Sequence, residues 1–294
     1  MNIKTWATAL RVRHWIKSGF CLAALFFHGD AFDLAAWRAV LPMVAAFSLV
    51  SSAGYLLNDI VNRLEDRRHP RKRHRPIAAG LIGSGQAWIA IALLVTAGLA
   101  VGFSFYGPGK AMACVGGYLG LTAAYSLWLR GIPVVDVLAV AAGFAARVAA
   151  GSYALQSIYE DVYPTPWLLV CTYFLAMLIG FGKRKGEEAL LVHEHQEFGP
   201  TRKALRGYRP RLLNFLTAGS AALAGGAYVM YCLQRPEPVP FVLSAIPAIM
   251  GLGSYLRLAW RSSLVEMPEF LLLRDPVLTG SVALWVLMVA LFTT

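Results

Sequence analysis

Long apolar runs alternate with short polar segments along almost the whole chain. A helix needs about 20 mostly apolar residues to cross the hydrocarbon core of a bilayer, which is about 30 Å thick. Nine runs reach or approach that length, and we expect each to form a transmembrane helix: residues 14–30, 37–57, 86–105, 110–128, 133–154, 165–181, 210–232, 240–258 and 277–293. The pattern predicts an all-α polytopic membrane protein, in which residues 1–294 form a single integral membrane domain.

The first run, residues 14–30, is short and has charged residues at both ends. Its alternative is a cleaved signal peptide. Phe26, Phe27 and His28 do not give the small-residue pattern of a cleavage site, so we expect a retained helix.

Composition agrees with a membrane protein, because 57% of the residues are hydrophobic and only 15% are charged. The net charge of +11 would suggest nucleic-acid binding in a soluble protein, but its distribution does not. If the loops alternate between two sides, most of the 27 Lys and Arg residues fall on one side, and the opposite loops hold Arg38, Lys110 and Arg235. The positive-inside rule makes the basic side cytoplasmic. We therefore expect no nucleic-acid partner, a plasma (inner) membrane location, a cytoplasmic N-terminus and an external C-terminus.

Two polar loops, residues 58–85 and 182–209, each follow an apolar run and fall on the same predicted side. We expect both to cap one functional site. In the first loop Asn58, Asn62 and Asp66 are four residues apart, with Asp59 beside them, so a continuing helix would align their oxygens along one face. Oxygen ligands of this kind suit Mg²⁺, which takes one or two carboxylates and completes its coordination with water and substrate phosphates.

Basic residues accompany these carboxylates. The first loop contains Lys72 and Arg75 among other cations, and the second contains Lys183 and Arg184 with Glu187. Carboxylates that bind metal, next to cations that bind phosphate, predict a magnesium-diphosphate site with a second phosphate-binding cluster. The alternatives are that the first loop anchors to anionic lipid headgroups and that the second only sets topology.

Two charged residues fall within or beside apolar runs. Asp136 begins the fifth run, and Arg147 lies within it among small residues that allow close helix contact. An arginine at that depth requires an anion. The pattern leaves open a structural partner, such as Asp136 or Asp59, and a bound lipid phosphate.

The polar segments resemble the motifs of the UbiA superfamily of intramembrane prenyltransferases. Asn58, Asp59, Asp66 and the stretch from His69 to Gly80 resemble NDxxDxxxD followed by RP, Arg13, Trp15 and Lys17 match RPxQWxKN, Tyr125 to Asp136 match YSxxLKxxPxxD, and Gly143 to Gly151 match GFxxRxxAG. The resemblance covers nearly the whole chain. It implies a nine-transmembrane-helix UbiA-type bundle with its active site at the cytoplasmic side.

One motif separates branches of the superfamily. Members that prenylate aromatic rings usually carry a second aspartate motif, DxxxD, where this chain has GKRKGEE, similar to the KRxxE pattern of the phosphoribosyl-transferring branch. The resemblance therefore implies transfer of 5-phosphoribosyl from phosphoribosyl pyrophosphate to a polyprenyl phosphate such as decaprenyl phosphate. Pyrophosphate would leave, Mg²⁺ would be the cofactor, and the product would serve cell wall biosynthesis. An aromatic prenyltransferase acting on 4-hydroxybenzoate or a quinone precursor is the alternative, and an anion transporter is a rival from another class.

The resemblance also implies roles for individual residues. Asn58, Asp59 and Asp66 would hold Mg²⁺, and Asp59, Asp66, Asp136 and Glu187 would be the catalytic residues. Lys72 and Arg75 would bind pyrophosphate, Lys183 and Arg184 the 5-phosphate of the donor, Lys17 and Arg147 the lipid phosphate, and Tyr125 the sugar. Asn62 replaces the second aspartate of the family motif, which removes one charge from the metal site. Membrane lipid is an expected partner, and a homo-oligomer stays open.

Overall fold

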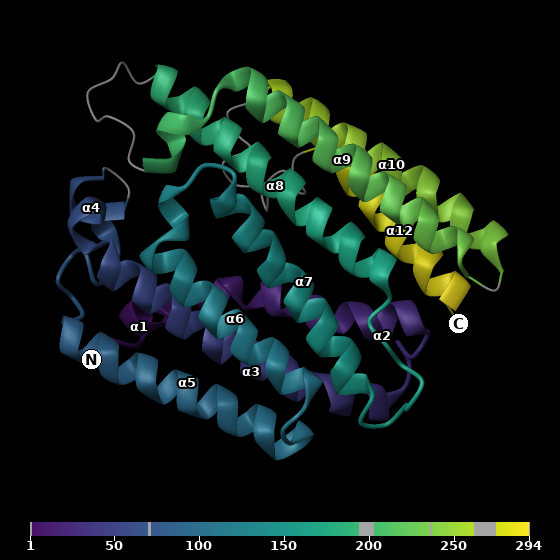
Figure 1. The fold of residues 1–294 in the computed structure, drawn as a ribbon, viewed down its shortest axis with the longest axis horizontal. Coiled ribbons are helices and arrows are strands. Elements are labelled where there is room, and N and C mark those ends of the chain that lie inside the picture. The colour runs from purple at the N-terminus through teal and green to yellow at the C-terminus, as the bar shows by residue number, and fades with distance from the viewer. Residues whose placement is uncertain (1, 70–71, 194–202, 236, 262–274, 294) are drawn as a thin grey trace. The chain divides into compact units, whose positions relative to one another are not determined.

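The computed structural model describes residues 2–69, 72–193, 203–235, 237–261 and 275–293, without the side chains of 189–193, 203, 206 and 293 (Figure 1). All regular elements in these ranges are helices, so the prediction of an all-helical chain is confirmed for them. In chain order they are α1 (Ile3–Ala9), η1 (Val12–Leu22), α2 (Ala23–His28), α3 (Leu34–Val61), α4 (Arg63–Arg68), η2 (Lys72–His74), α5 (Ser84–Tyr106), α6 (Lys110–Leu127), η3 (Leu129–Gly131), α7 (Val135–Leu155), α8 (Pro166–His193), η4 (Lys203–Gly207), α9 (Pro210–Leu233), α10 (Pro238–Arg261) and α12 (Pro276–Thr293).

Six of the described helices are long and apolar enough to span a membrane. They are α3, α5, α7, the Pro166–Glu188 part of α8, α9 and α10, and a shorter apolar helix covers Pro276–Phe292. The first predicted span is made of the 3-10 helix η1 followed by the short helix α2. The count of nine transmembrane helices therefore stays a prediction.

The chain divides into two compact units. Unit 1 comprises residues 1–25, 33–132 and 146–163, and unit 2 comprises 26–32, 133–145 and 164–294. Helix α7 contributes its first half to unit 2 and its second half to unit 1.

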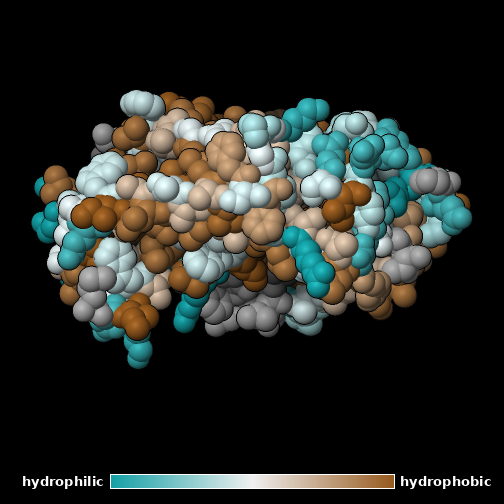
Figure 2. Space-filling view, turned by 90° about the horizontal axis from the view of Figure 1, so that it is seen from below, coloured by the Kyte–Doolittle hydropathy of each residue, from teal (hydrophilic) through white to brown (hydrophobic). Residues whose placement is uncertain are grey.

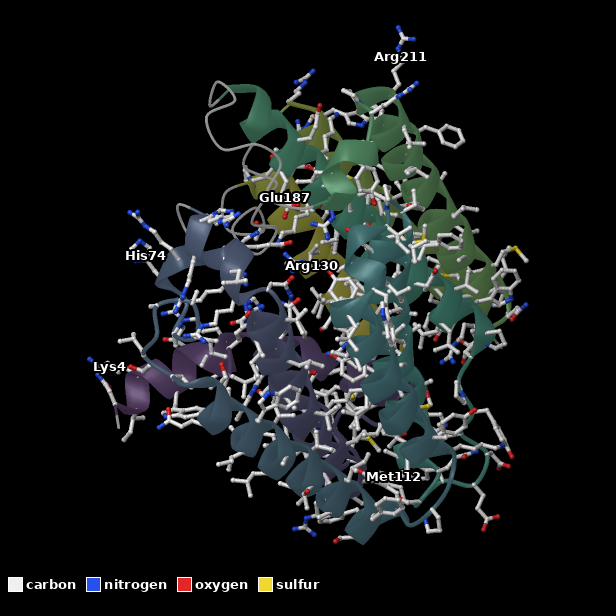
Figure 3. The ribbon with its side chains drawn as sticks, turned by 60° about the vertical axis from the view of Figure 1, so that its left-hand side comes forward. Lys4, His74, Met112, Arg130, Glu187 and Arg211 are labelled. Atoms are coloured by element: carbon white, nitrogen blue, oxygen red, sulfur yellow. The ribbon has the colours of Figure 1, made fainter. Side chains whose placement is uncertain are left out.

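In unit 1, α3 packs along α5, α6 and η1. Glycines of α5 make its contacts with α3 and α6 close, because an added Cβ at Gly98 would lie 2.8 Å from Val50 of α3, and one at Gly102 would lie 2.4 Å from the sulfur of Met112 of α6. Met112 is labelled in Figure 3. Small residues allow the same close approach in other membrane helices, where contact area and not the hydrophobic effect holds helices together.

In unit 2, α8 packs along α9, and α10 packs along both α9 and α12. A buried cluster of Leu178, Ala221, Tyr255, Ala259 and Leu278 joins α8, α9, α10 and α12. Dispersion contacts among these side chains fix the relative positions of the four helices.

The outer surfaces of these helices carry many exposed apolar side chains, as expected for contact with lipid. On α5, Trp88, Leu93 and Phe103 are exposed, whereas Ala87, Gly98 and Gly102 on the other face are buried. Apolar residues cover much of the face that Figure 2 shows. This arrangement agrees with an integral membrane protein.

Replacing Gly151 with Ala should destabilise unit 1. The new Cβ would lie 1.9 Å from the carbonyl oxygen of Cys21, and a backbone atom cannot move aside as a flexible side chain can. Such overpacking costs about 1–3 kcal/mol of unfolding free energy, so we expect a lower melting temperature in detergent. Gly116→Ala on α6 is the control, because its Cβ would meet nothing within 4 Å. Equal melting temperatures for the two variants would contradict this packing.

Candidate functional site

The first polar cluster lies in unit 1, where α3 passes into α4. Asp59 is in the last turn of α3 and Asp66 is in α4, and they are buried, with 3% and 1% of their surfaces exposed. The backbone N–H of Asp66 donates to the carbonyl of Asn62 across the junction at 2.9 Å. The predicted helix past residue 58 is therefore present but has a break at Asn62.

Arg75 brings the two buried carboxylates together. Its Nη1 atom donates to Asp59 Oδ1 at 3.1 Å and to Asp66 Oδ2 at 2.7 Å. The turns around η2 return the chain so that Arg75 meets residues nine and sixteen positions earlier. One cationic atom thus lies within reach of both carboxylates.

Arg11, which the sequence analysis did not assign to the site, also contacts Asp59. Its Nη2 donates to Asp59 Oδ1 at 2.6 Å, and its guanidinium lies 4.6 Å from the centre of the Tyr55 ring. Burial lowers the pKa of Arg11, and the Asp59 carboxylate opposes that shift. Two guanidiniums therefore face two carboxylates, and their formal charges cancel.

A strained backbone presents Arg11 to this cluster. Arg11 has φ of 52° and ψ of 48°, in the left-handed region that residues other than glycine rarely adopt. Ser52 on α3 donates to the carbonyl of Leu10 at 2.9 Å and accepts from the indole of Trp15 at 3.0 Å, which fastens the segment on both sides of Arg11. Arg11 was missed because the sequence analysis matched Arg13 to the RPxQWxKN motif, although the arginine of that motif stands four residues before its tryptophan, which is position 11 when Trp15 is the tryptophan.

The two asparagines of the predicted metal site bond to each other. The Asn62 amide donates to the Asn58 carbonyl at 2.6 Å and to Asn58 Oδ1 at 3.1 Å, and Asn58 donates to Asp59 Oδ1 at 3.4 Å. Glu65 contacts Arg130 at 3.4 Å and has a half-exposed side chain, so it does not join the carboxylate pair. The chain thus presents two convergent carboxylates supported by amides.

The oxygen atoms of this cluster fit a divalent cation whose coordination is completed by other ligands. No group of three or more His, Cys, Asp or Glu side chains gathers within the described ranges. Mg²⁺ commonly uses only one or two carboxylates and takes its other ligands from water and phosphate. Asp59 and Asp66 satisfy this requirement, since one nitrogen atom already contacts both.

Arg147 lies among hydroxyls and aromatic rings in unit 1. Its Nη2 donates to Ser51 at 2.9 Å and to Tyr118 at 2.8 Å, and its guanidinium lies 4.4 Å and 5.6 Å from the ring centres of Tyr118 and Phe47. The side chain is buried and connects α7 with α3 and α6. These contacts hold the guanidinium at the interior of the unit.

Three further predicted residues of unit 1 lie on separate elements. Lys17 is on η1, Lys72 is on η2, and Tyr125 is on α6, and all three are half-buried. His74, next to Lys72 on η2, is exposed and is labelled in Figure 3. Their roles stay predictions.

The second polar cluster lies in unit 2 and joins α7 to α8. Arg184 donates from Nε to Asp136 at 2.8 Å and from Nη1 to Glu187 at 2.7 Å. Asp136 is fully buried and Arg184 nearly so, whereas Lys183 is exposed. The structure thus gathers Asp136, Arg184 and Glu187 and leaves the neighbouring lysine exposed, whereas the sequence analysis had weighed Asp136 as a partner of Arg147.

Tyr208 completes this cluster and was not predicted. Its hydroxyl donates to Asp136 Oδ1 at 2.6 Å and accepts from the backbone N–H of Val134 at 2.6 Å. Val134 has a φ of 67°, a strained conformation for a β-branched residue, immediately before α7. Burial and the adjacent Asp136 raise the pKa of Tyr208, so the phenol remains a proton donor at neutral pH. Asp136 therefore accepts hydrogen bonds from both Arg184 and Tyr208, one on each carboxylate oxygen.

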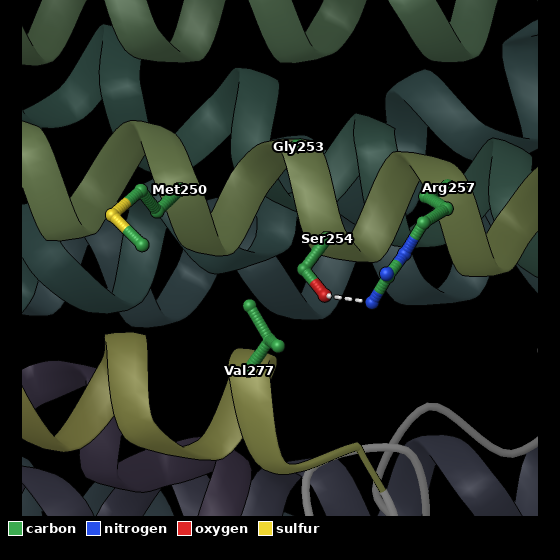
Figure 4. A pocket seen from close by; sticks show the side chains of 5 residues that line it. All are labelled: Met250, Gly253, Ser254, Arg257 and Val277. Atoms are coloured by element: carbon green, nitrogen blue, oxygen red, sulfur yellow. Dashed lines mark hydrogen bonds between the residues drawn. The ribbon is translucent and has the colours of Figure 1, made fainter.

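A separate cavity of about 260 Å³ lies between α10 and α12 (Figure 4). Met250, Gly253, Ser254, Arg257 and Val277 line it. Arg257 and Ser254 both donate to Asp275, at 3.0 Å each. None of these residues belongs to the two polar clusters described above.

The helical spans, the exposed apolar surface and the buried charge clusters define an integral membrane protein with paired acidic and basic motifs. The family model of the UbiA prenyltransferase family matches residues 18–274. The chain belongs to the UbiA prenyltransferase family.

Two relatives of this chain carry the same protein name. A protein of Corynebacterium glutamicum named decaprenyl-phosphate phosphoribosyltransferase is 34% identical over 229 residues, which cover 76% of this chain and 65% of the relative. The chain thus spans about two thirds of the length of that relative. A protein of the same name from Mycobacterium tuberculosis is 30% identical over 287 residues, which cover 95% of this chain and 90% of that protein.

A solved structure supports the fold. The UbiA homolog of Archaeoglobus fulgidus, determined with GPP and Mg²⁺, superimposes with a TM-score of 0.70 over 97% of each chain. At 16% sequence identity this likeness concerns the fold alone.

Proposed function

We propose that this protein transfers the 5-phosphoribosyl group of phosphoribosyl pyrophosphate to a polyprenyl phosphate in the membrane. The observation that carries the proposal is the convergence of Asp59 and Asp66 on one cationic atom, in a chain with two relatives named decaprenyl-phosphate phosphoribosyltransferase. The KRxxE-like sequence at Lys183, Arg184 and Glu187 supports the same donor.

The reaction requires little proton chemistry. An oxygen of the lipid phosphate attacks C1 of the ribose, the bond from C1 to the pyrophosphate oxygen breaks, and the configuration at C1 inverts. The attacking phosphate monoester is already anionic at neutral pH, so no general base is needed. The protein must therefore position the two substrates and stabilise the charge on the leaving pyrophosphate.

The unit 1 cluster supplies groups for the leaving pyrophosphate. Asp59 and Asp66, with the amide of Asn58, are the residues that would hold Mg²⁺, and Asn62 supports them by orienting Asn58. A bound Mg²⁺ would offset the charge of the departing pyrophosphate. Lys72 and Arg75 would bind its outer oxygens through charge-assisted hydrogen bonds.

The remaining groups would bind the other parts of the substrates. We assign Lys183 to the 5-phosphate of the donor because it is exposed next to Arg184. Asp136 and Glu187 orient Arg184, since both accept from its guanidinium. Lys17 and Arg147 would bind the lipid phosphate and Tyr125 the sugar. We further propose nine transmembrane helices, with the N-terminus and the site on the cytoplasmic side.

A labelling assay tests the proposed function. The purified protein is given radiolabelled phosphoribosyl pyrophosphate with decaprenyl phosphate and, in a parallel reaction, a labelled prenyl diphosphate with 4-hydroxybenzoate. We expect label in the lipid fraction of the first reaction only, with a requirement for Mg²⁺ that EDTA reveals. Product in the second reaction alone would identify an aromatic prenyltransferase and reject the proposal.

A further inference from the structure

The contacts of the unit 1 carboxylates use only part of their hydrogen-bonding capacity. Asp59 Oδ1 accepts from Arg11, Arg75 and Asn58, and Asp66 Oδ2 accepts from Arg75. Within the described residues, no donor is found on Asp59 Oδ2 or on Asp66 Oδ1. Each carboxylate thus has one oxygen that accepts from guanidinium and a second oxygen that no guanidinium of the described residues engages.

The guanidiniums and a metal ion would compete for these carboxylates. Two buried carboxylates require compensating positive charge, and Arg11 and Arg75 supply it. A divalent cation that binds both carboxylates makes this charge redundant. A buried or half-buried guanidinium without an anion is itself costly, so each arginine then requires a new anion. A diphosphate is such an anion, and guanidinium binds phosphate oxygens through two N–H groups at once.

We propose that Arg11 and Arg75 form an exchangeable guanidinium pair, which neutralises Asp59 and Asp66 in the absence of a divalent cation and binds the diphosphate of the donor after the cation has bound. The sequence analysis gave Arg11 no role in this site. The left-handed backbone at residue 11 and the bonds of Ser52 to Leu10 and Trp15 keep its guanidinium over Asp59. The inference rests on the proposed function only in that the donor carries a diphosphate.

This proposal predicts changes of opposite sign in the affinity for Mg²⁺ and in the affinity for pyrophosphate. Removing either arginine removes a competitor, so Mg²⁺ alone should bind more tightly. The same change removes a phosphate ligand, so inorganic pyrophosphate should bind the magnesium-loaded protein more weakly. A purely structural arginine would weaken both or change neither.

The test measures thermal unfolding in detergent during titration with MgCl₂, with no organic substrate present. We expect Arg11→Gln and Arg75→Gln to melt at lower temperature without Mg²⁺, because a buried carboxylate loses its counterion. We expect the Mg²⁺ concentration for half-maximal stabilisation to fall about tenfold in each variant, which corresponds to about 1.4 kcal/mol. The additional stabilisation by inorganic pyrophosphate at saturating Mg²⁺ should shrink in both.

Arg67→Gln is the matched control, because Arg67 is an exposed cation of α4 next to Asp66 and donates to the carbonyl of Ala78. It should keep the wild-type Mg²⁺ midpoint. If Arg75→Gln does not fold, Arg75→Lys retains a charge and should give a smaller shift in the same direction. The inference is overturned if the midpoints of the Arg11 and Arg75 variants stay unchanged or rise, if Arg67→Gln shifts equally, or if the pyrophosphate effect is undiminished. The unfolding test uses no phosphoribosyl donor. Its result therefore does not depend on which donor the labelling assay identifies.

Discussion

Replacing Asp59 with Asn should slow magnesium-dependent pyrophosphate release by about 10²- to 10³-fold, the usual cost of removing one group that stabilises transition-state charge. The substitution keeps the size of the side chain and removes its negative charge. Asp59 lies at the centre of the first cluster, where Arg11, Arg75 and Asn58 all donate to one of its oxygens. Asp59→Ala should have at least the same effect. The measurement is initial release of pyrophosphate from labelled phosphoribosyl pyrophosphate, at several Mg²⁺ concentrations.

Glu65→Gln is the control for this experiment. It also removes one negative charge, in this case from α4. Glu65 is half-exposed and contacts Arg130. Its turnover should stay close to wild type. Gel filtration in detergent confirms that the Asp59 variants remain folded, and unchanged turnover in a folded Asp59 variant would refute the metal assignment.

Replacing Arg184 with Met should give the largest loss of stability. Asp136 has no exposed surface, and Arg184 forms an ion pair with it at 2.8 Å, so replacing Arg184 takes a cation away from a buried carboxylate that Tyr208 also contacts. Removing one partner of a buried ion pair typically costs about 3–5 kcal/mol of unfolding free energy. Thermal or denaturant unfolding in detergent measures the effect. The double variant Asp136→Asn with Arg184→Met should recover part of the loss, because both charges are then absent.

Lys183→Met separates stability from substrate binding. Lys183 is the exposed neighbour of Arg184, so its replacement should change stability by less than about 0.5 kcal/mol. If Lys183 binds the 5-phosphate, this variant should chiefly raise KM for phosphoribosyl pyrophosphate. An Arg184→Met protein that unfolds at the wild-type temperature would contradict the buried ion pair.

Much of the site could be predicted because its residues lie close together in sequence. Asn58, Asp59, Asn62 and Asp66 fall at helical spacing, and a helix with one break does carry them. Arg184 and Glu187 are three residues apart and form an ion pair on α8. Local periodicity is sufficient in such cases, because neighbouring turns of one helix place these side chains together.

Arg11 and Tyr208 could not be found in this way. Arg11 contacts a residue 48 positions later, and Tyr208 contacts one 72 positions earlier. Each contact depends on an irregular backbone conformation, at Arg11 itself and at Val134, where neither residue type favours a positive φ. Arg147 was expected to need an anion, and its hydroxyl and aromatic contacts depend on the packing of α3, α6 and α7.

The sequence by itself determined the helical class, the membrane location and the residues of both charged motifs, because the length of an apolar run and the spacing of polar residues are local properties. Only the tertiary structure decided which charges neutralise one another. Arg75 joins Asp59 to Asp66, and Arg184 joins Asp136 to Glu187. The reason is physical: a buried charge requires a partner within a few ångströms, and chain folding, not sequence distance, brings that partner there.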